Sequence, residues 1–122
     1  MDRGADGIAM AYDEKLAAHL RELLAGERGV QEQRMFGGLA FLVGGNMAIA
    51  ASGGGGGGAL VRCDPADTDD LVATTRAERF EMRGRAMQGW LRVDSDDVRT
   101  KRELSRWVDV GVAYARSLPP KR

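Results

Sequence analysis

The sequence predicts a single α+β domain, in which an antiparallel sheet of about five strands is flanked by helices. Two observations carry this prediction. Apolar, strand-like runs punctuated by glycine pairs fill residues 34–51, and apolar side chains recur at helical spacing toward both ends of the chain. A length of 122 residues supports one hydrophobic core and not two.

The first helix is predicted over residues 12–25, where leucines recur at helical spacing and form a single apolar stripe. Asp13 can cap the start of this helix, because a short carboxylate accepts hydrogen bonds from free amide groups. Gly26 can end the helix. His19 lies near the apolar stripe, so we expect it at the boundary between core and solvent.

A three-strand antiparallel meander is predicted next. Large and small side chains alternate over residues 39–43, as in a strand with two different faces. Gly44-Gly45-Asn46 tolerates the positive φ angles of a tight hairpin, and residues 47–51 then return as the partner strand. Gly37-Gly38 can form a bulge or a sharp bend after the segment 34–36.

Six consecutive glycines, residues 53–58, precede a further strand that resumes at Leu60. Glycine-rich loops that cradle phosphate stand between a strand and a helix, and the Walker form adds Lys-Ser/Thr. Here a strand follows and neither residue type is in place. We therefore expect a flexible hairpin loop with no nucleotide site.

The second half of the chain begins with Asp64-Pro65, an N-cap followed by proline at the first helical position, and this helix is expected to reach about Thr75. A short strand is predicted at residues 80–82, a turn or extended loop at 84–88, and a strand at 89–93.

The last helix begins with a capping box formed by Thr100 and Glu103, and Pro119-Pro120 stops it. Gly111 lies in its middle, where glycine lowers helix propensity. Close packing of this helix on a neighbouring element would explain the glycine.

Charge and composition exclude several classes of protein. Eighteen basic residues balance eighteen acidic ones, so no global field attracts nucleic acid or an acidic membrane, although a local basic patch is compatible with this balance. No apolar run approaches membrane-spanning length, and the N-terminus does not resemble a signal peptide. We expect a cytoplasmic protein with a disordered leader at residues 1–9 and a domain at residues 10–122.

Candidate catalytic and metal-binding residues are few. Cys63 ends an apolar run and is expected to be a small buried thiol, and a nucleophilic pair with His19 is the less favoured alternative. The aspartates at residues 67–70 lack the spacing of a calcium loop and more simply favour the helix dipole. We predict no catalytic set, no metal site and no cofactor.

Two positions allow more than one interpretation. Arg34 is either a snorkelling or salt-bridged edge residue, or a contact for an anion or a partner. Trp90 is either a core residue with the arginines solvated on the opposite face, or part of a basic and aromatic surface with Arg83, Arg85 and Arg92. The first interpretation is favoured in both cases.

These residues together resemble the N-terminal domain of TfoX/Sxy proteins. The resemblance spans nearly the whole chain from Met10, and its motifs occur in the expected order: Arg34-Met35-Phe36-Gly37-Gly38, Phe41, Gly45-Asn46-Met47, Leu60-Val61-Arg62, Gly84-Arg85-Ala86-Met87, Gly89-Trp90 and the helix from Trp107 to Pro120. It implies a two-layer fold similar to secretion-chaperone-like domains. Larger relatives regulate natural competence and carry a second, C-terminal domain, whereas this sequence ends after the first domain. The six-glycine loop is longer than the hairpin usual in such proteins.

The resemblance favours a non-enzymatic regulatory or interaction module, linked to transcriptional regulation or competence through an unidentified protein partner. Its candidate contact residues are Arg34, Arg62, Arg85 and Met87. The alternative is a small enzyme, with Glu78 or Glu81 as acid or base, or a protein associated with nucleic acid. A homodimer is also expected, because exposed sheet edges permit pairing between copies.

Overall fold

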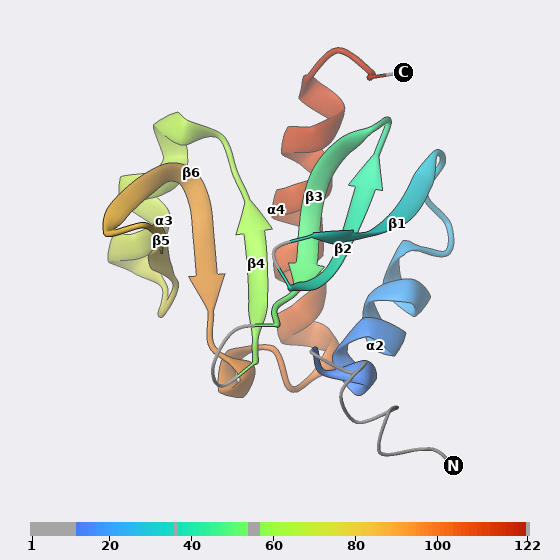
Figure 1. Ribbon diagram of the computed structural model, residues 1–122, viewed down its shortest axis with the longest axis horizontal. Helices are drawn as coiled ribbons and strands as arrows, with labels where there is room; N and C mark the ends of the chain where they lie inside the picture. Colours follow the sequence, from blue (N-terminus) through green and yellow to red (C-terminus); the bar gives the residue numbers. More distant parts are fainter. Residues whose placement is uncertain (1–11, 36, 54–56, 122) are drawn as a thin grey trace.

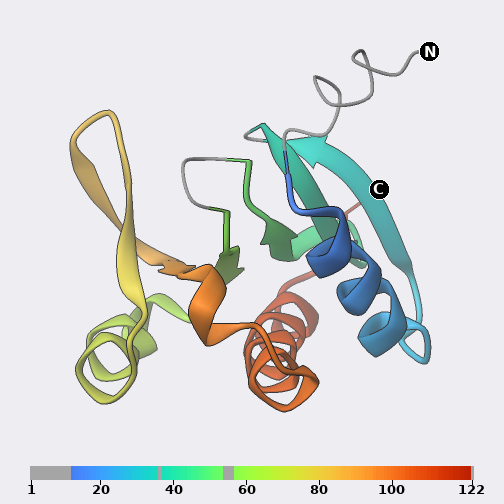
Figure 2. The same ribbon diagram turned by 90° about the horizontal axis from the view of Figure 1, so that it is seen from below.

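The computed structural model describes residues 12–35, 37–53 and 57–121. In these residues three α-helices and six strands form one α+β domain, in which the helices lie on one face of a single antiparallel sheet (Figures 1 and 2). The strand order is β1-β2-β3-β4-β6-β5. The predicted fold class is confirmed, with one strand more than expected. The predicted leader at residues 1–9 lies outside the described residues.

The strands are β1 (Val30–Met35), β2 (Gly38–Val43), β3 (Asn46–Ala51), β4 (Ala59–Arg62), β5 (Glu78–Met82) and β6 (Arg85–Val93). The α-helices are α2 (Glu14–Leu24), α3 (Thr68–Thr74) and α4 (Lys101–Ser117), and short 3₁₀ turns, η1 (Pro65–Asp67) and η2 (Ser95–Asp97), precede α3 and α4. The main core lies between the helices and the sheet, and Leu20, Phe41, Ile49 and Leu104 are among its largest fully buried side chains.

The predicted caps at the helix N-termini are confirmed. The side chain of Asp13 accepts hydrogen bonds at the start of α2, Asp64 caps η1, and Thr100 with Glu103 forms the capping box of α4. Pro65 occupies the first turn of η1, and the predicted helix continues as α3.

Strands β1, β2 and β3 form the predicted antiparallel meander. Gly44 and Gly45 have φ angles of 62° and 83°, as a tight hairpin requires. Gly37, with a φ of 76°, provides the sharp bend between β1 and β2. Phe36 of the same motif lies outside the described residues.

A β-bulge at Ala48 was not evident in the sequence. Phe41 pairs with Ile49 and Leu42 pairs with Met47, so Ala48 has no partner on β2. An extra residue in one strand bends it and places two consecutive side chains on the same face. Ala48 and Ile49 accordingly both belong to the core under the helices.

Helix α4 packs on this bulge through Gly111. A Cβ atom added at Gly111 would lie 2.3 Å from the carbonyl oxygen of Ala48, so only glycine permits this approach. The prediction that Gly111 marks close packing on a neighbouring element is confirmed.

The interpretation of residues 84–88 as a turn or extended loop is wrong. Residues 85–88 belong to β6, and the turn that joins β5 to β6 is Arg83-Gly84, with φ angles of 55° and 79°. Pairing with β5 holds the segment extended, although its side chains show no clear apolar alternation.

The glycine run connects two neighbouring strands, because β3 and β4 pair antiparallel and the Ser52 amide donates to the Gly58 carbonyl over 2.9 Å. The predicted hairpin connection is thus confirmed, while residues 54–56 lie outside the described residues. Within the described ranges, no helix combines the length and the apolar character needed to cross a membrane.

Candidate interaction surface

The face of the sheet turned away from the helices is called the open face here, because no described helix covers it (Figure 2). Side chains alternate between the two faces of a strand, so every second residue of the central strands points to this face. They form a second, smaller apolar cluster: Ala40, Leu42, Met47, Ala50 and Leu60 are buried, and Met35, Phe80 and Trp90 are partly buried against them. Aromatic and thioether groups are therefore available at the margins of the open face.

Arg62 is held between two aromatic rings. It is the last residue of β4 and pairs with Trp90 of β6, and its guanidinium carbon lies 5.1 Å from the centre of the Trp90 ring. The Tyr114 ring of α4 lies 5.3 Å away. Each contact of this kind contributes on the order of 0.5–1 kcal/mol at a partly exposed site. The two rings fix the cation at the end of β4.

The β5–β6 hairpin projects from the body of the domain (Figure 2). Arg85 is exposed near its turn and Met87 is half-buried. The pairing is irregular, because Arg79 faces Leu91 whereas Glu81 already faces Ala86. The tip of β6 therefore bends away from the sheet and presents Arg85 and Met87 at its end.

Gly89 anchors the base of this hairpin. Its amide donates to the buried Thr68 hydroxyl over 2.8 Å, and its carbonyl accepts from the Cys63 amide over 2.9 Å. Gly89 has a φ of 87°, and an added Cβ would lie 3.2 Å from the Cys63 carbonyl oxygen. The hairpin thus projects from a fixed base.

The four candidate contact residues do not form one site. Arg62, Arg85 and Met87 belong to β4 and β6, on one half of the sheet, whereas Arg34 is exposed on β1 at the far edge. Arg34 points to the helix side of the sheet, because it pairs with the core residue Leu39. A partner bound at the β5–β6 hairpin would therefore not contact Arg34 through the same surface.

The favoured interpretation of Trp90 is wrong in one respect. Arg92 pairs with Leu60, and Arg62 pairs with Trp90, so Arg92 lies on the same face as Trp90 and not on the opposite one. Trp90 is half-buried against the open-face cluster and not part of the main core. Trp90 and Arg92 thus share one face of the sheet, as the alternative interpretation, a basic and aromatic surface, requires.

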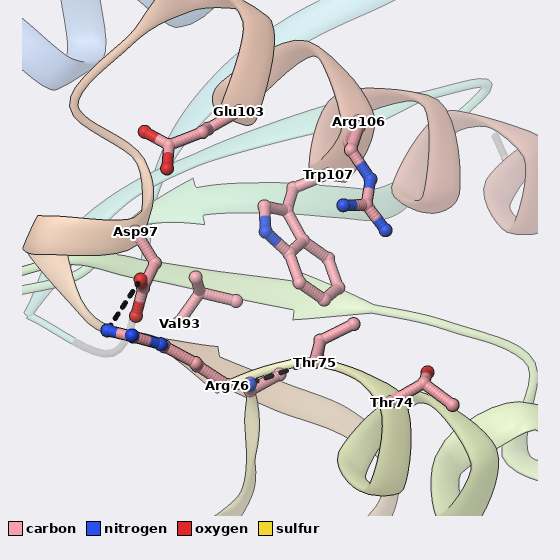
Figure 3. Close-up of a pocket in the computed structure, with 9 residues that line it drawn as sticks. Thr74, Thr75, Arg76, Val93, Asp97, Glu103, Arg106 and Trp107 are labelled. Carbon is pink, nitrogen blue, oxygen red and sulfur yellow. Dashed lines mark hydrogen bonds and ion pairs between the residues drawn. The ribbon is translucent and has the colours of Figure 1, made fainter.

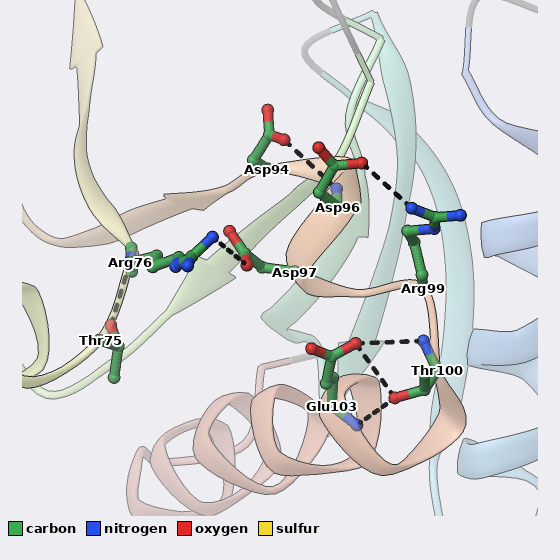
Figure 4. Close-up of polar contacts among 9 residues, drawn as sticks. Thr75, Arg76, Asp94, Asp96, Asp97, Arg99, Thr100 and Glu103 are labelled. Carbon is green, nitrogen blue, oxygen red and sulfur yellow. Dashed lines mark hydrogen bonds and ion pairs between the residues drawn. The ribbon is translucent and has the colours of Figure 1, made fainter.

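A pocket of about 240 Å³ lies on the helix side, where the indole of Trp107 points from α4 toward Val93 and Thr75 (Figure 3). The guanidinium of Arg76 lies 3.8 Å from the Asp97 carboxylate at one end of this pocket. Figure 4 shows the local contacts of η2 and, separately, those of the start of α4: Arg99 lies 3.7 Å from Asp96, and Thr100 and Glu103 form the capping box. Two cations and two anions line the pocket, so its charge selects no class of ligand.

Cys63 is buried, as predicted. Burial raises the pKa of its thiol, and the nearby Asp67 and Asp64 carboxylates act in the same direction, while a contact with Thr68 partly offsets them. A thiol with a raised pKa is a poor nucleophile. His19 is half-buried, as expected of a boundary residue, and lines a different pocket from Cys63.

No group of histidine, cysteine, aspartate and glutamate that could hold a metal occurs among the residues described. Asp69, one of the clustered aspartates, instead forms an ion pair with Arg79.

Comparison with known families gives one match, to a family described as TfoX N-terminal domain, over residues 22–115. The matched region begins within α2 and ends near the end of α4, so it includes the whole sheet. Curated proteins yield no match to this chain.

Proposed function

Because the chain belongs to the TfoX N-terminal domain family, we propose that it is a non-enzymatic regulatory module that acts through a protein partner, in transcriptional regulation or competence. The family match supports a regulatory role in general terms.

One observation carries the choice of contact surface: the β5–β6 hairpin projects from an anchored base and joins the margin of the open face. Residues 78–92 contain four arginines and two glutamates, a local net charge of +2 in a chain that is neutral overall. Exposed arginines beside methionine and tryptophan are typical of protein contact sites. We therefore expect a partner that presents acidic and apolar side chains.

The roles within this surface differ. Arg85 would supply a flexible charged contact near the hairpin tip, and Met87 an adaptable apolar one. Arg62, in contact with Trp90 and Tyr114, would present a cation whose side chain is partly ordered before binding. Such a preordered group costs less conformational entropy on binding.

The test is a cross-linked pull-down from the native cell, with and without nuclease, read by mass spectrometry. We expect a protein partner that survives nuclease and is captured at least tenfold less by Arg85→Glu. The matched control is Arg102→Glu, the same charge change at an exposed position on α4. Equal capture by both variants would remove Arg85 from the site.

Arg85→Ala and Arg34→Ala separate structural from functional roles at two of the four candidate contact residues. Both side chains are exposed, so both variants should fold like the wild type by circular dichroism. Partner capture should be lost in Arg85→Ala and kept in Arg34→Ala, because Arg34 lies on β1 at the other edge of the sheet. Unfolding of both variants would show that these arginines are structural.

Direct binding of nucleic acid is the second candidate, favoured by the position of Arg62 and Arg92 on the same face as Trp90. Aromatic rings beside cations can stack bases of single strands. This function predicts affinity for single-stranded DNA or RNA that falls steeply with salt and is lost in Trp90→Ala. Absent or salt-independent binding would exclude it.

An enzymatic role is the third candidate, and it would require a ligand. The exposed carboxylates Glu78 and Glu81 are the available acid or base groups on β5. If the chain is non-enzymatic, as proposed, a thermal-shift screen against nucleotides and methyl donors should give no stabilisation. A reproducible rise in melting temperature with one compound would revive the enzymatic alternative.

A further inference from the structure

Strand β1 is an unpaired edge of the sheet in the described part of the chain. It pairs with β2 without any shift of register along all of its six residues, and Gln31, Glu32, Gln33 and Arg34 are exposed. The opposite edge, β5, has an irregular ladder and belongs to the projecting hairpin. An edge with a regular ladder can accept another strand, whereas an irregular one resists pairing.

The hairpin geometry fixes which backbone groups of β1 point outward. In an antiparallel ladder, residues that exchange hydrogen bonds with the partner alternate with residues that do not. The Gly44 amide donates to the Gly29 carbonyl over 3.2 Å, which places the odd-numbered residues of β1 in the bonded positions. Val30, Glu32 and Arg34 therefore direct their amide and carbonyl groups away from β2, toward the free edge.

These outward residues allow only a few symmetric pairings with a second copy of β1. If Glu32 faced Glu32 of the second copy, like charges would oppose each other on the symmetry axis. If Glu32 faced Arg34 of the second copy, opposite charges would meet twice, and Gln33 would lie on the axis. Opposite charges across a ladder stabilise it and like charges destabilise it, so the sequence of β1 selects the second register.

We propose that the chain forms a symmetric dimer by antiparallel pairing of two β1 strands, with Gln33 at the two-fold axis and Glu32 of each copy opposite Arg34 of the other. The two sheets then continue as one. About four backbone hydrogen bonds and two ion pairs cross the axis.

The side-chain contacts within one copy agree with this arrangement. Arg34 makes no hydrogen bond or ion pair through its guanidinium with another described residue. Arg21 donates to both carboxylate oxygens of Glu32, over 2.7 Å to Oε2 and 3.0 Å to Oε1, and both neighbours of Glu32 on β1 are uncharged. A carboxylate can accept from two guanidinium groups, so Glu32 can bind Arg34 of the second copy without releasing Arg21.

The helix side of β1 has room for these ion pairs. A groove of about 450 Å³ separates β1 from α2, and its lining includes Glu32, Val30, Arg21 and Glu27. Glu32 and Arg34 point to the side of the sheet on which this groove lies, since they pair with the core residues Phe41 and Leu39. Helix α2 therefore leaves space beside Glu32 on this face of the edge strand.

The dimer does not depend on the proposed function, because the β5–β6 hairpin lies at the other end of the sheet order. Pairing through β1 leaves both hairpins free, at the two ends of the joined sheet. Loss of the dimer and loss of partner capture can therefore be measured separately.

Charge exchange tests the register. Sedimentation equilibrium of the wild-type chain should show a monomer–dimer equilibrium, and Glu32→Arg or Arg34→Glu alone should weaken association about tenfold or more, since each makes like charges meet twice. An equimolar mixture of the two variants should recover association, because opposite charges then meet twice in the mixed dimer. Arg83→Glu, at the other edge, is the matched control and should dimerise like the wild type.

Disulfide trapping tests the axis. Paired positions without backbone hydrogen bonds have Cα atoms about 4.5 Å apart, within reach of a disulfide. Gln33→Cys should form a covalent dimer under mild oxidation. Gln31→Cys should not, because its symmetric copies would lie roughly 14 Å apart. The native Cys63 is buried and serves as an internal control in the wild-type chain.

A wild-type chain that stays monomeric at its highest soluble concentration would overturn the proposal. A dimer that survives both single charge reversals, or that is trapped through Gln31→Cys and not through Gln33→Cys, would overturn the register. Circular dichroism shows whether each variant is folded. Recovery of association in the equimolar mixture also shows that both charge variants are folded.

Discussion

Replacement of Gly111 by alanine tests how α4 is seated on the sheet. The added Cβ would lie 2.3 Å from the carbonyl oxygen of Ala48 and 2.8 Å from its carbonyl carbon. Both are backbone atoms of a bulge inside the core, so neither can rotate away as a side chain would. The helix must instead move outward by about 1 Å to restore a normal contact distance.

Two opposing effects decide the sign of the change in stability. Alanine is favoured over glycine within a helix by about 1 kcal/mol. Overpacking of a well-filled core costs about 1–3 kcal/mol, and a clash with the backbone on both atoms lies toward the upper end of that range. We therefore expect Gly111→Ala to lower the free energy of unfolding by about 2 kcal/mol, which corresponds to a fall in melting temperature of roughly 6–10 °C for a chain of this size.

The assay is thermal and urea unfolding followed by far-ultraviolet circular dichroism. The urea midpoint should fall with an unchanged slope, because the surface exposed on unfolding is nearly the same. Gly26→Ala is the matched control: a Cβ at that position meets nothing within 4 Å, so its stability should be unchanged or slightly raised. A Gly111→Ala variant as stable as the wild type would refute the close packing of α4 on Ala48.

Three further predictions follow from individual contacts. A hydrogen bond from Arg21 lowers the pKa of Glu32, so this exposed pair stabilises the fold above the ordinary pKa of 4.5, and its contribution is lost as pH falls through the lower folded value. Glu32→Gln should cost under about 1 kcal/mol near pH 7, and in acid-unfolding curves the difference from wild type should vanish once the pH is below the lowered pKa of Glu32. Because burial raises the pKa of Cys63, its thiol should react with Ellman's reagent far more slowly in the native protein than in urea, and equal rates would contradict its burial. The buried Asn46 amide donates to the Pro119 carbonyl over 3.0 Å, so Asn46→Ala should lower the urea-derived unfolding free energy by about 1–3 kcal/mol, and an unchanged midpoint would show that this contact does not hold the chain after α4.

The elements that could be predicted are those whose signals are local. Asp13 and the pair Thr100 and Glu103 cap helices with their own neighbours, so the boundaries of α2 and α4 follow from adjacent residues. Gly44-Gly45 specifies a hairpin turn without reference to the rest of the chain. The family resemblance rests on the same motifs and is confirmed by the match over residues 22–115.

The elements that could not be predicted depend on pairing between distant segments. Residues 85–88 become part of β6 because β5 provides an extended partner, not because their own sequence favours a strand. The bulge at Ala48 appears only once the register of β2 and β3 is known. Nothing near Ala48 in the sequence shows that Gly111 will approach it.

The same limit applies to the candidate contacts. Arg62 could be named from its motif, but its position between Trp90 and Tyr114 requires β4 to pair with β6 and α4 to cross beneath them. Arg34 and Arg85 carry similar charges and both are exposed, yet the strand order separates them by nearly the full sheet. Sequence motifs identified the residues, and only the topology shows that they serve two surfaces.

This separation gives each surface its own experimental consequence. The fold depends on the helix side of the sheet, where Gly111 meets Ala48 and the largest side chains are buried. Arg34 and Arg85 lie outside that core, so reversing either charge should leave the unfolding free energy of the monomer, measured at concentrations below those of dimer formation, within about 0.5 kcal/mol of the wild type. Arg34→Glu should then change association between copies and Arg85→Glu partner capture. A variant that loses both properties would mean that dimerisation is required for partner binding, since no shared contact connects the two sites.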